Sequence, residues 1–394
     1  MKKTLMILGS VVCVAIAVLL VVFLGGKDAE NDSGLVFRLN GSQDGYVVVG
    51  VSDDATTDIV IPKTYDGLPV VEIGNQAFID CKFLYTIVLP EGITAIGTRA
   101  FRGCSNLSKI NLPDTLKTIG NSAFSLCTSL RTITIPDGVK ALNGETFREC
   151  TALDSVTLPD GLETIGNTVF YQCQKLESIT IPKSVKSIGE WAFADCAALT
   201  KIELPEGVKT IPLRAFYRCQ MLESITVPNS VKSIGDYAFH TCKKLQSITL
   251  PEGLESIGKS AFWDCLALST LTLPDSVTSI GEFAFHSCSA MTTVTLSAAI
   301  TNYESYLFYD CASLASVVIP VTVKKMTYTA FVECPQSAIF YYCGTESEKA
   351  DMTLEDTNTH PFLSNATWYF YSESAPATEG NFWHYVDGKP TIWQ

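Results

Sequence analysis

The fold of this chain is decided by the stretch LQSITLPEGLESIGKSAFWDCLA, from Leu245 to Ala267, and by its copies. With the phenylalanine of its Ala-Phe pair set as position 0, a phenylalanine recurs every 23 residues (101 − 78 = 23) without insertion. The twelve residues are Phe78, Phe101, Phe124, Phe147, Phe170, Phe193, Phe216, Phe239, Phe262, Phe285, Phe308 and Phe331. A fixed period of this length predicts a solenoid, in which each unit is one coil that buries its apolar face only against its neighbours.

Each unit contains the pattern of one short strand. Aliphatic residues stand at positions +9 and +11, as in Ile133 and Ile135, and two residues of this spacing share one face of a strand. The residues between and beside them are mostly Ser and Thr, which point the other way. Proline at +12, as in Pro136, ends the strand because it has no N–H to donate.

The remaining positions of the unit predict the rest of the coil. Cysteine stands at +3 in all twelve units, aliphatic residues stand at +6, +15 and +18, and glycine often follows at +19. We expect a tight helical or 3₁₀ segment around the Ala-Phe pair. The prediction is an α/β repeat solenoid: right-handed, with one parallel sheet of short strands, short helical or 3₁₀ turns opposite, and β caps at both ends.

The unit LxxIxLPxxLxxIGxxAFxxC resembles the leucine-rich repeat of the BspA-like bacterial surface proteins (Treponema pallidum type), from about Ile59 to Cys343. The resemblance implies a curved or gently twisted solenoid displayed on a cell surface. It also implies adhesion to host proteins or coaggregation between cells. The last coils depart from the pattern, since Ser297 replaces proline, Tyr303 replaces isoleucine and Thr327 replaces glycine. We expect these changes to mark an approaching end cap.

The N-terminus fits the pattern of an export signal. Two lysines precede an apolar run of about 20 residues, which is long enough to span a bilayer and has no good cleavage site before Lys27. The interpretation is an uncleaved anchor over residues 1–26, with the lysines in the cytoplasm; the alternative is secretion after signal cleavage. The formal net charge of −13 argues against nucleic acid and anionic lipid surfaces, because both attract basic patches.

The anchor is followed by four further segments. Residues 27–34 are interpreted as a linker, and residues 35–76 as an N-terminal β cap with the first coil. The repeat array covers residues 77–343. Residues 344–394 are interpreted as an acidic loop, to about Pro361, followed by a C-terminal β cap with aromatic strand patterns at Ala366–Ser372 and Asn381–Gln394.

The repeated cysteines are predicted to be thiols rather than disulfides or zinc ligands. One cysteine per coil at a fixed position stacks in a column, and pairing its members would break the uniform coil. Buried free cysteine behaves as a small apolar residue. Zinc is disfavoured because the chain has no CxxC motif and no paired histidines.

Two surfaces are candidate binding sites. The first is an array of hydroxyls on the outward strand face, where a solvated strand also favours threonine for purely structural reasons. Its candidate contacts are Thr134, Thr157, Thr180, Thr226, Thr249, Thr272 and Thr295. Ice binding is disfavoured because Lys201 and Glu203 interrupt the array.

The second candidate surface is aromatic. Positions −2 and +1 of coils five to eleven carry rings, and residues three apart on a helical turn share a face. Its candidate residues are Trp191, Tyr217, Tyr237, His240, Trp263, Phe283, His286, Tyr306 and Tyr309, with Tyr171 before them. The rings either shield the core or form a contact patch for a protein or glycan, since exposed aromatic side chains are favoured anchors.

No enzyme motif appears, and no cofactor or metal is expected. The leading hypothesis is a monomeric, surface-anchored binding protein with an extracellular protein or glycan ligand. The alternatives are a structural or self-associating surface protein and a glycan-binding module that serves a partner enzyme.

Overall fold

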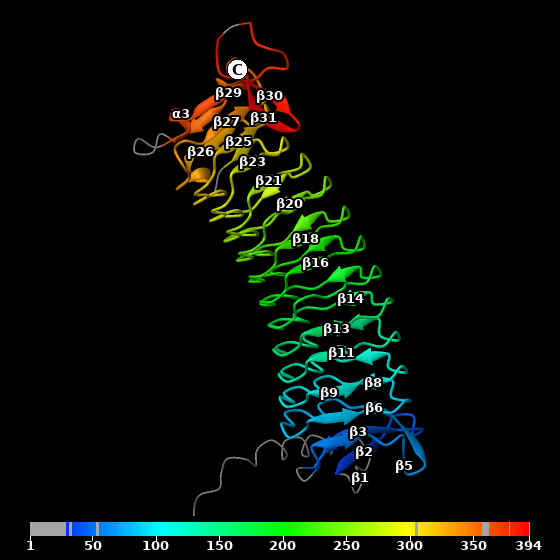
Figure 1. The fold of residues 1–394 in the computed structure, drawn as a ribbon. Coiled ribbons are helices and arrows are strands. Elements are labelled where there is room, and N and C mark those ends of the chain that lie inside the picture. Colours follow the sequence, from blue (N-terminus) through cyan, green and yellow to red (C-terminus); the bar gives the residue numbers. More distant parts are fainter. Residues whose placement is uncertain are drawn as a thin grey trace, which may run out of the picture.

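The computed structural model describes residues 29–30, 34–52, 55–303, 306–356, 362–377 and 379–393. The expected anchor, residues 1–26, lies outside these ranges. Figure 1 shows an elongated stack of coils that runs from the N-terminal strands at one end to the C-terminal strands at the other. Within the described ranges, no helix is long and apolar enough to cross a membrane.

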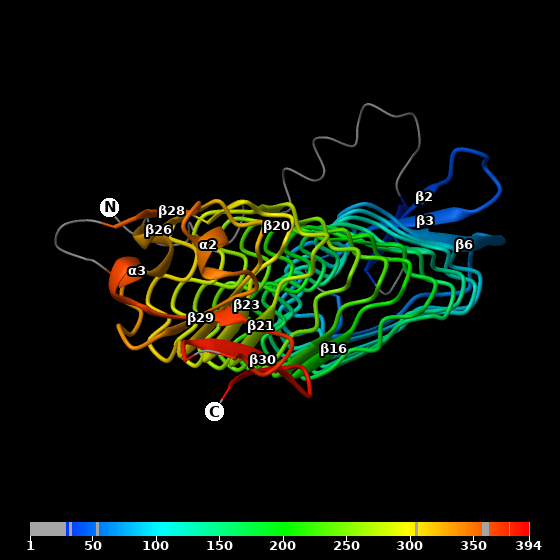
Figure 2. The same ribbon diagram turned by 90° about the horizontal axis from the view of Figure 1, so that it is seen from above.

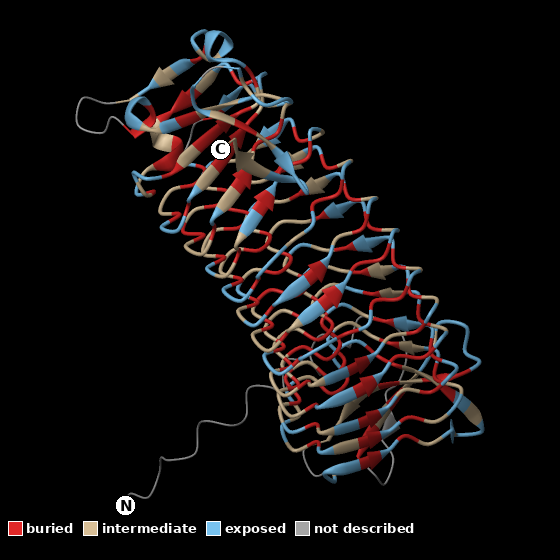
Figure 3. Ribbon diagram, turned by 45° about the horizontal axis from the view of Figure 1, so that its top comes forward, coloured by how far each residue is buried: buried red, intermediate tan, exposed pale blue. Residues whose placement is uncertain are grey.

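The first row of strands is the predicted one. It comprises β4 (Asp58–Val60), β7 (Thr86–Val88), β9 (Lys109–Asn111), β11 (Thr132–Thr134), β13 (Ser155–Thr157), β16 (Lys201–Glu203), β18 (Ser224–Thr226), β21 (Thr270–Thr272), β23 (Thr293–Thr295) and β25 (Ser316–Ile319). Paired strands are parallel, with each residue opposite the one 23 positions later, as in Ile133 opposite Val156. The central residue of a strand is buried and its two neighbours face solvent, as the alternation predicts (Figure 3).

The single sheet of the prediction is wrong, because each coil adds a second, shorter strand. This row comprises β8 (Ala95–Ile96), β10 (Thr118–Ile119), β12 (Ala141–Leu142), β14 (Thr164–Ile165), β15 (Ser187–Ile188), β17 (Thr210–Ile211), β19 (Ser233–Ile234), β20 (Ser256–Ile257), β22 (Ser279–Ile280), β24 (Asn302–Tyr303) and β26 (Lys325–Thr327). Its members also pair in parallel. Two residues are too short for a visible alternation, so the sequence showed only the buried aliphatic at +18.

The segment around the Ala-Phe pair is a turn rather than the predicted helix. In one coil, the N–H groups of Arg214, Phe216 and Arg218 donate to carbonyls of the next coil at 2.8–3.0 Å. A helix would direct these donors along its own axis, whereas the stacked coils satisfy them from the neighbour. Among the described residues, a 3₁₀ helix at this place occurs only in the last unit, as η2 (Tyr328–Phe331).

The interior is lined by two columns of identical side chains. The phenylalanine column, Phe78 to Phe331, is 0–1% exposed, and successive rings stack at 5.1–5.8 Å between centroids. The cysteine column runs beside it, and each thiol from Cys104 to Cys334 donates to a phenylalanine carbonyl of the preceding coil at 3.0–3.4 Å. Figure 2, which looks down the stack, shows the coils enclosing this interior.

The N-terminal strands begin the stack as a predicted hairpin. β2 (Leu35–Leu39) pairs antiparallel with β3 (Tyr46–Val51), which pairs in parallel with β6 (Leu68–Ile73). β5 (Thr64–Tyr65) pairs antiparallel with β6, and β1 (Ala29–Glu30) pairs with β2. The predicted linker therefore contains a short strand. That this region acts as a cap remains a prediction.

The C-terminal region continues the coil beyond the predicted end of the array. The expected loop contains α2 (Glu346–Lys349) and β28 (Thr353–Glu355), and β28 pairs in parallel with β26. After α3 (Phe362–Asn365), β29 (Thr367–Tyr371) pairs with β27 (Ile339–Tyr342), so the stacking persists across a spacing of 28 residues (367 − 339 = 28). The loop prediction failed because the repeat motif is lost here although the strand pairing is kept.

The chain ends in an antiparallel hairpin that covers the outer sheet face. β30 (Phe382–Val386) pairs with β31 (Lys389–Ile392), as the Asp387-Gly388 turn predicts. Trp383 is fully buried against Val318 and Tyr341, and its Nε1–H donates to the Tyr342 carbonyl at 2.9 Å. The outer face is therefore closed at this end of the solenoid.

Candidate binding surface

The turn of a coil has two positions that can reach its outside. The residues at −1 and 0 are buried, and the larger side chains at −2 and +1 on either side of them reach the surface, whereas the small ones, such as Ser260 and Ala194, are buried. The backbone at −2 has positive φ in coil after coil, including 58° at Trp191 and 56° at Tyr237. Residues with a side chain rarely adopt this conformation, and here the hydrogen bonds between coils hold it.

The predicted aromatic residues lie in one continuous array, here called the aromatic stripe. Its members are Tyr171, Trp191, Tyr217, Tyr237, His240, Trp263, Phe283, His286, Tyr306 and Tyr309. Consecutive rings are joined by centroid distances of 3.7–6.1 Å. Tyr306 is 40% exposed and the other rings are half-buried. The rings thus form a partly exposed surface, and binding of a ligand to that surface stays a prediction.

Some ring faces of the stripe are occupied by other rings. His286 stacks on Trp263 at 3.7 Å with 5° between planes, and on Tyr309 at 4.6 Å with 14°. What such a stack offers to solvent is ring edges, which carry the positive part of the aromatic quadrupole. These edges attract hydrogen-bond acceptors and anions, as well as the negative faces of other rings.

The two histidines of the stripe are held by short hydrogen bonds. Ser287 donates its hydroxyl to Asp310 at 2.9 Å, so His286 Nδ1 donates to the serine Oγ at 2.8 Å. His240 Nδ1 lies 2.7 Å from the Thr241 hydroxyl. Burial lowers the pKa of both imidazoles below the ordinary value, although nearby aspartates oppose the shift. The stripe is therefore neutral at these positions at pH 7.

Arg214 is part of this surface and was missed by the sequence analysis. Its guanidinium carbon lies 4.4 Å from the ring centroid of Trp191 and 4.7 Å from that of Tyr237, so the cation is held between two rings. The signal was present, because Arg214 occupies position −2 between two aromatic −2 residues, each one period away. Ser260, one period after Tyr237 at the same position −2, is buried, and the sequence analysis did not anticipate this gap among the rings.

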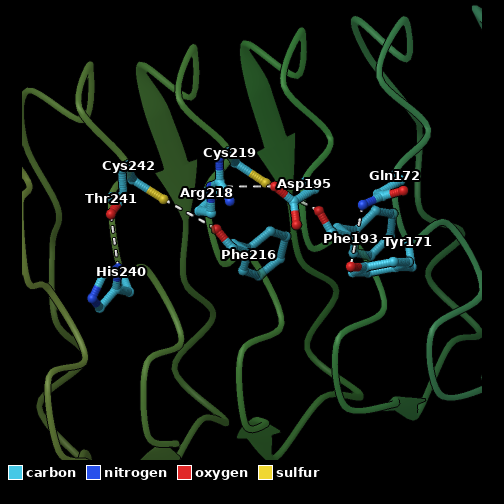
Figure 4. A network of polar contacts seen from close by, with 10 residues as sticks. All are labelled: Tyr171, Gln172, Phe193, Asp195, Phe216, Arg218, Cys219, His240, Thr241 and Cys242. Carbon is cyan, nitrogen blue, oxygen red and sulfur yellow. Dashed lines mark hydrogen bonds and ion pairs between the residues drawn. The ribbon is translucent and has the colours of Figure 1, made fainter. Parts of the chain in front are cut away.

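Figure 4 shows how the polar contacts divide between inside and outside in this region. The thiols of Cys219 and Cys242 point to phenylalanine carbonyls in the interior. On the outside, Arg218 Nε lies 3.3 Å from Asp195 Oδ1, so this neighbouring arginine is neutralised.

The threonine candidates lie on another side of the coil. Six of them are exposed and Thr295 is half-buried. Most of these threonines lie in strands of the first row, where Thr134, for example, is paired with Thr157. Thr180 and Thr249 lie outside the named strands. The sheet is thus interrupted twice along this face, and the hydroxyls do not form one regular lattice.

The cysteine column shows no reactive chemistry. None of the thirteen cysteines in the described ranges is in a disulfide. Burial raises the pKa of the column thiols from Cys104 to Cys288, that of Cys150 to about 12, which keeps them protonated. Within the same ranges, no group of three or more His, Cys, Asp or Glu side chains could hold a metal ion.

Comparison with known proteins identifies the repeat. The model of the BspA type leucine rich repeat region matches in six copies, over residues 71–200, 126–228 and 209–338. A leucine-rich repeat protein of Bacteroides ovatus is similar at 26% identity, with 88% of this chain and 94% of that chain covered and a TM-score of 0.72.

Two further solved structures are similar over shorter lengths or at lower scores. The T. pallidum leucine-rich repeat protein is 32% identical over 55% of this chain and 91% of its own, with a TM-score of 0.41. A leucine rich cell surface protein of Faecalibacterium prausnitzii is 23% identical over 84% and 98%, with a TM-score of 0.44. No curated protein matches. The family model covers more than half of the chain, and the chain belongs to the BspA-type leucine-rich repeat family.

Proposed function

We propose that this chain is a non-enzymatic binding protein of the bacterial cell surface, and that it docks a protein ligand on the aromatic stripe. The observation that carries the proposal is the continuity of the rings from Tyr171 to Tyr309 at the surface of successive coils. Half-buried aromatic side chains lose little conformational freedom on binding and are enriched where binding energy concentrates.

A protein ligand fits this surface better than a glycan. Sugars bind aromatic residues through open ring faces, whereas His286 has Trp263 on one face and Tyr309 on the other. The edges that remain, with the donors of Trp263 and the tyrosine hydroxyls, suit backbone carbonyls and acidic side chains. The threonine face is the second choice, because its sheet is interrupted and it lacks anchoring rings.

Surface display rests on the family and on the N-terminal apolar run. The BspA-type family supports a place outside the cell, and two lysines before about 20 apolar residues support membrane anchoring. The expected monomer follows from a solenoid that already buries its own core.

A binding screen with matched variants tests the proposal. The full-length chain is immobilised and offered matrix proteins, whole cells and a glycan array. Tyr237→Ala with Trp263→Ala should abolish or strongly weaken capture of the protein ligand, because both rings belong to the stripe.

The control alters the same two coils on the opposite candidate surface. Thr249→Ala with Thr272→Ala should leave capture unchanged. Equal binding by the ring variant and the wild type would reject the stripe, and loss in the threonine variant would move the site to the strand face. Association of the chain with itself alone would favour the structural alternative.

A further inference from the structure

Arg214 carries its charge in an unusual setting. The guanidinium lies between the rings of Trp191 and Tyr237, and Tyr217 lies 5.6 Å away as a third ring. Cation–π contact on both faces fixes the plane of the group and removes water from those faces. Its N–H donors, which lie in that plane, are then the part of the group left for hydrogen bonding.

Among the residues that the structure describes, no carboxylate pairs with this cation. The guanidinium makes no hydrogen bond or ion pair within the part of the chain that the structure describes, and its buried Nε has no partner. Arg148, on the equivalent turn of another coil, and Arg218, on the same turn as Arg214, are each paired with an acidic side chain, at 2.8 and 3.3 Å. An unpaired buried donor is costly unless a ligand satisfies it, and Arg214 as a whole is only half-buried.

We propose that Arg214 is the carboxylate-binding residue of the aromatic stripe, and that it receives an Asp or Glu side chain of a protein ligand. A fixed planar fork matches a carboxylate with two parallel hydrogen bonds, which a flexible ammonium does not. This role rests on the proposed function, since the rings around Arg214 would supply the apolar part of the same contact.

The charge of the chain makes such a contact selective. With a formal net charge of −13, most of the surface repels acidic groups. A ligand carboxylate is therefore accepted at Arg214 and discouraged elsewhere, so the residue fixes where along the stripe the ligand sits.

His240 provides an independent reporter. The positive charge of Arg214 contributes to lowering the pKa of His240, after the larger effect of burial. A carboxylate bound to Arg214 offsets that charge, so the pKa of His240 should rise on binding. A role of Arg214 in packing alone would leave the histidine unmoved.

A display library of random dodecapeptides, selected on the full-length chain, tests the inference. We expect the enriched peptides to contain Asp or Glu beside apolar residues. Arg214→Gln should lose the acidic enrichment and bind an enriched peptide on the order of tenfold more weakly, while still selecting apolar peptides. Arg214→Lys should recover binding only in part, because it keeps the charge without the fork.

The matched control is Arg218→Gln, which alters an arginine that already has a partner and should leave selection unchanged. The inference is overturned if wild-type peptides lack acidic residues, if Arg214→Gln selects the same peptides, or if the pKa of His240 stays fixed on binding. A glycan array screened in parallel distinguishes a protein ligand from a glycan ligand. Preferential binding of acidic sugars would show that the carboxylate belongs to a glycan and not to a protein. If no peptide is enriched at all, the protein-binding function fails together with this role.

Discussion

Two aromatic arrays run along this solenoid within two residues of each other in each unit, and they differ in burial and in how far their residues vary. The phenylalanine column is the same residue in all twelve units, is at most 1% exposed and stacks with 4–18° between rings. The aromatic stripe beside it mixes Tyr, Trp, Phe and His, with Arg214 held between two of its rings, and its ring angles range from 5° to 73°.

This difference distinguishes the residues that hold the coils together from the residues that face solvent. Each side chain of the column packs against the equivalent side chain of the coil before it and of the coil after it. A change in its volume therefore creates a cavity or a clash with both neighbours. A stripe residue has solvent on one side and tolerates variation. We infer that the column specifies the stack, whereas the stripe is free to encode binding.

The largest effect expected in the interior is protection of the thiols of the cysteine column, which lies beside the phenylalanine column. With the pKa of Cys150 raised to about 12 by burial, thiolate forms only when a coil opens. Cys104 to Cys334 should resist a thiol reagent in the folded chain and react fully in denaturant, as followed by mass spectrometry. Cys81 and Cys343, which are only partly buried, should react first. Absence of labelling in denaturant would show disulfides instead.

Substitutions at adjacent positions compare the two arrays directly. Phe216→Ala should lower the free energy of unfolding by about 3–5 kcal/mol, because it leaves a cavity between two stacked rings. Tyr217→Ala, one residue later on the stripe, should cost about 1 kcal/mol. Denaturant midpoints measured by circular dichroism give both values. Similar losses would mean that the stripe is structural after all.

The backbone of the stripe gives a smaller effect. Tyr237 has a φ of 56°, a conformation that costs a residue with a β-carbon about 1–2 kcal/mol relative to glycine. Tyr237→Gly should therefore be about 1 kcal/mol more stable than Tyr237→Ala, although both lose the ring. Thermal melts of the two variants test this, and an alanine variant of equal or higher stability would contradict it.

Much of the fold was accessible from the sequence because the repeat is free of insertions. The period of the repeat predicted the coil, and the alternation at positions +9 and +11 predicted the first row of strands. Pro136 and the equivalent prolines predicted where each of these strands ends. The second strand row and the turn were not predicted. Both depend on hydrogen bonds to the next coil, which no local pattern within one unit reveals.

The aromatic residues of the candidate surface were predicted from the sequence, but the cation among them, Arg214, was not. Spacing alone identified Tyr237 and Trp263, and the structure brings them into one stripe through His240. Arg214 was passed over because an arginine on a surface turn is ordinarily solvated, and only its position between two rings distinguishes it. The closing hairpin with Trp383 was likewise visible as strands, but not as a cover for Val318.

The smallest effect expected is a pH dependence that the stripe contributes and the phenylalanine column does not. The pKa of His286 is lowered in the folded chain, chiefly by burial, and Asp310 and Asp264 oppose this shift. The unfolded chain therefore binds a proton before the folded chain does, so this residue lowers stability as the pH falls below about 6.5. Titration of its imidazole proton by NMR should give a midpoint below that of an unfolded peptide.

A comparison of a His286 variant with the wild type separates the effect of His286 on the pH dependence of stability from the effect of the carboxylates. Burial raises the pKa of Glu72 and Asp195, and a raised carboxyl pKa has the opposite sign, since the folded chain then binds the proton first. His286→Gln should therefore lose less stability than the wild type between pH 7 and pH 5.5, with the carboxylates unchanged. Because the phenylalanine column has nothing to titrate, an equal pH response in the two chains would place the imidazole outside the packed stripe.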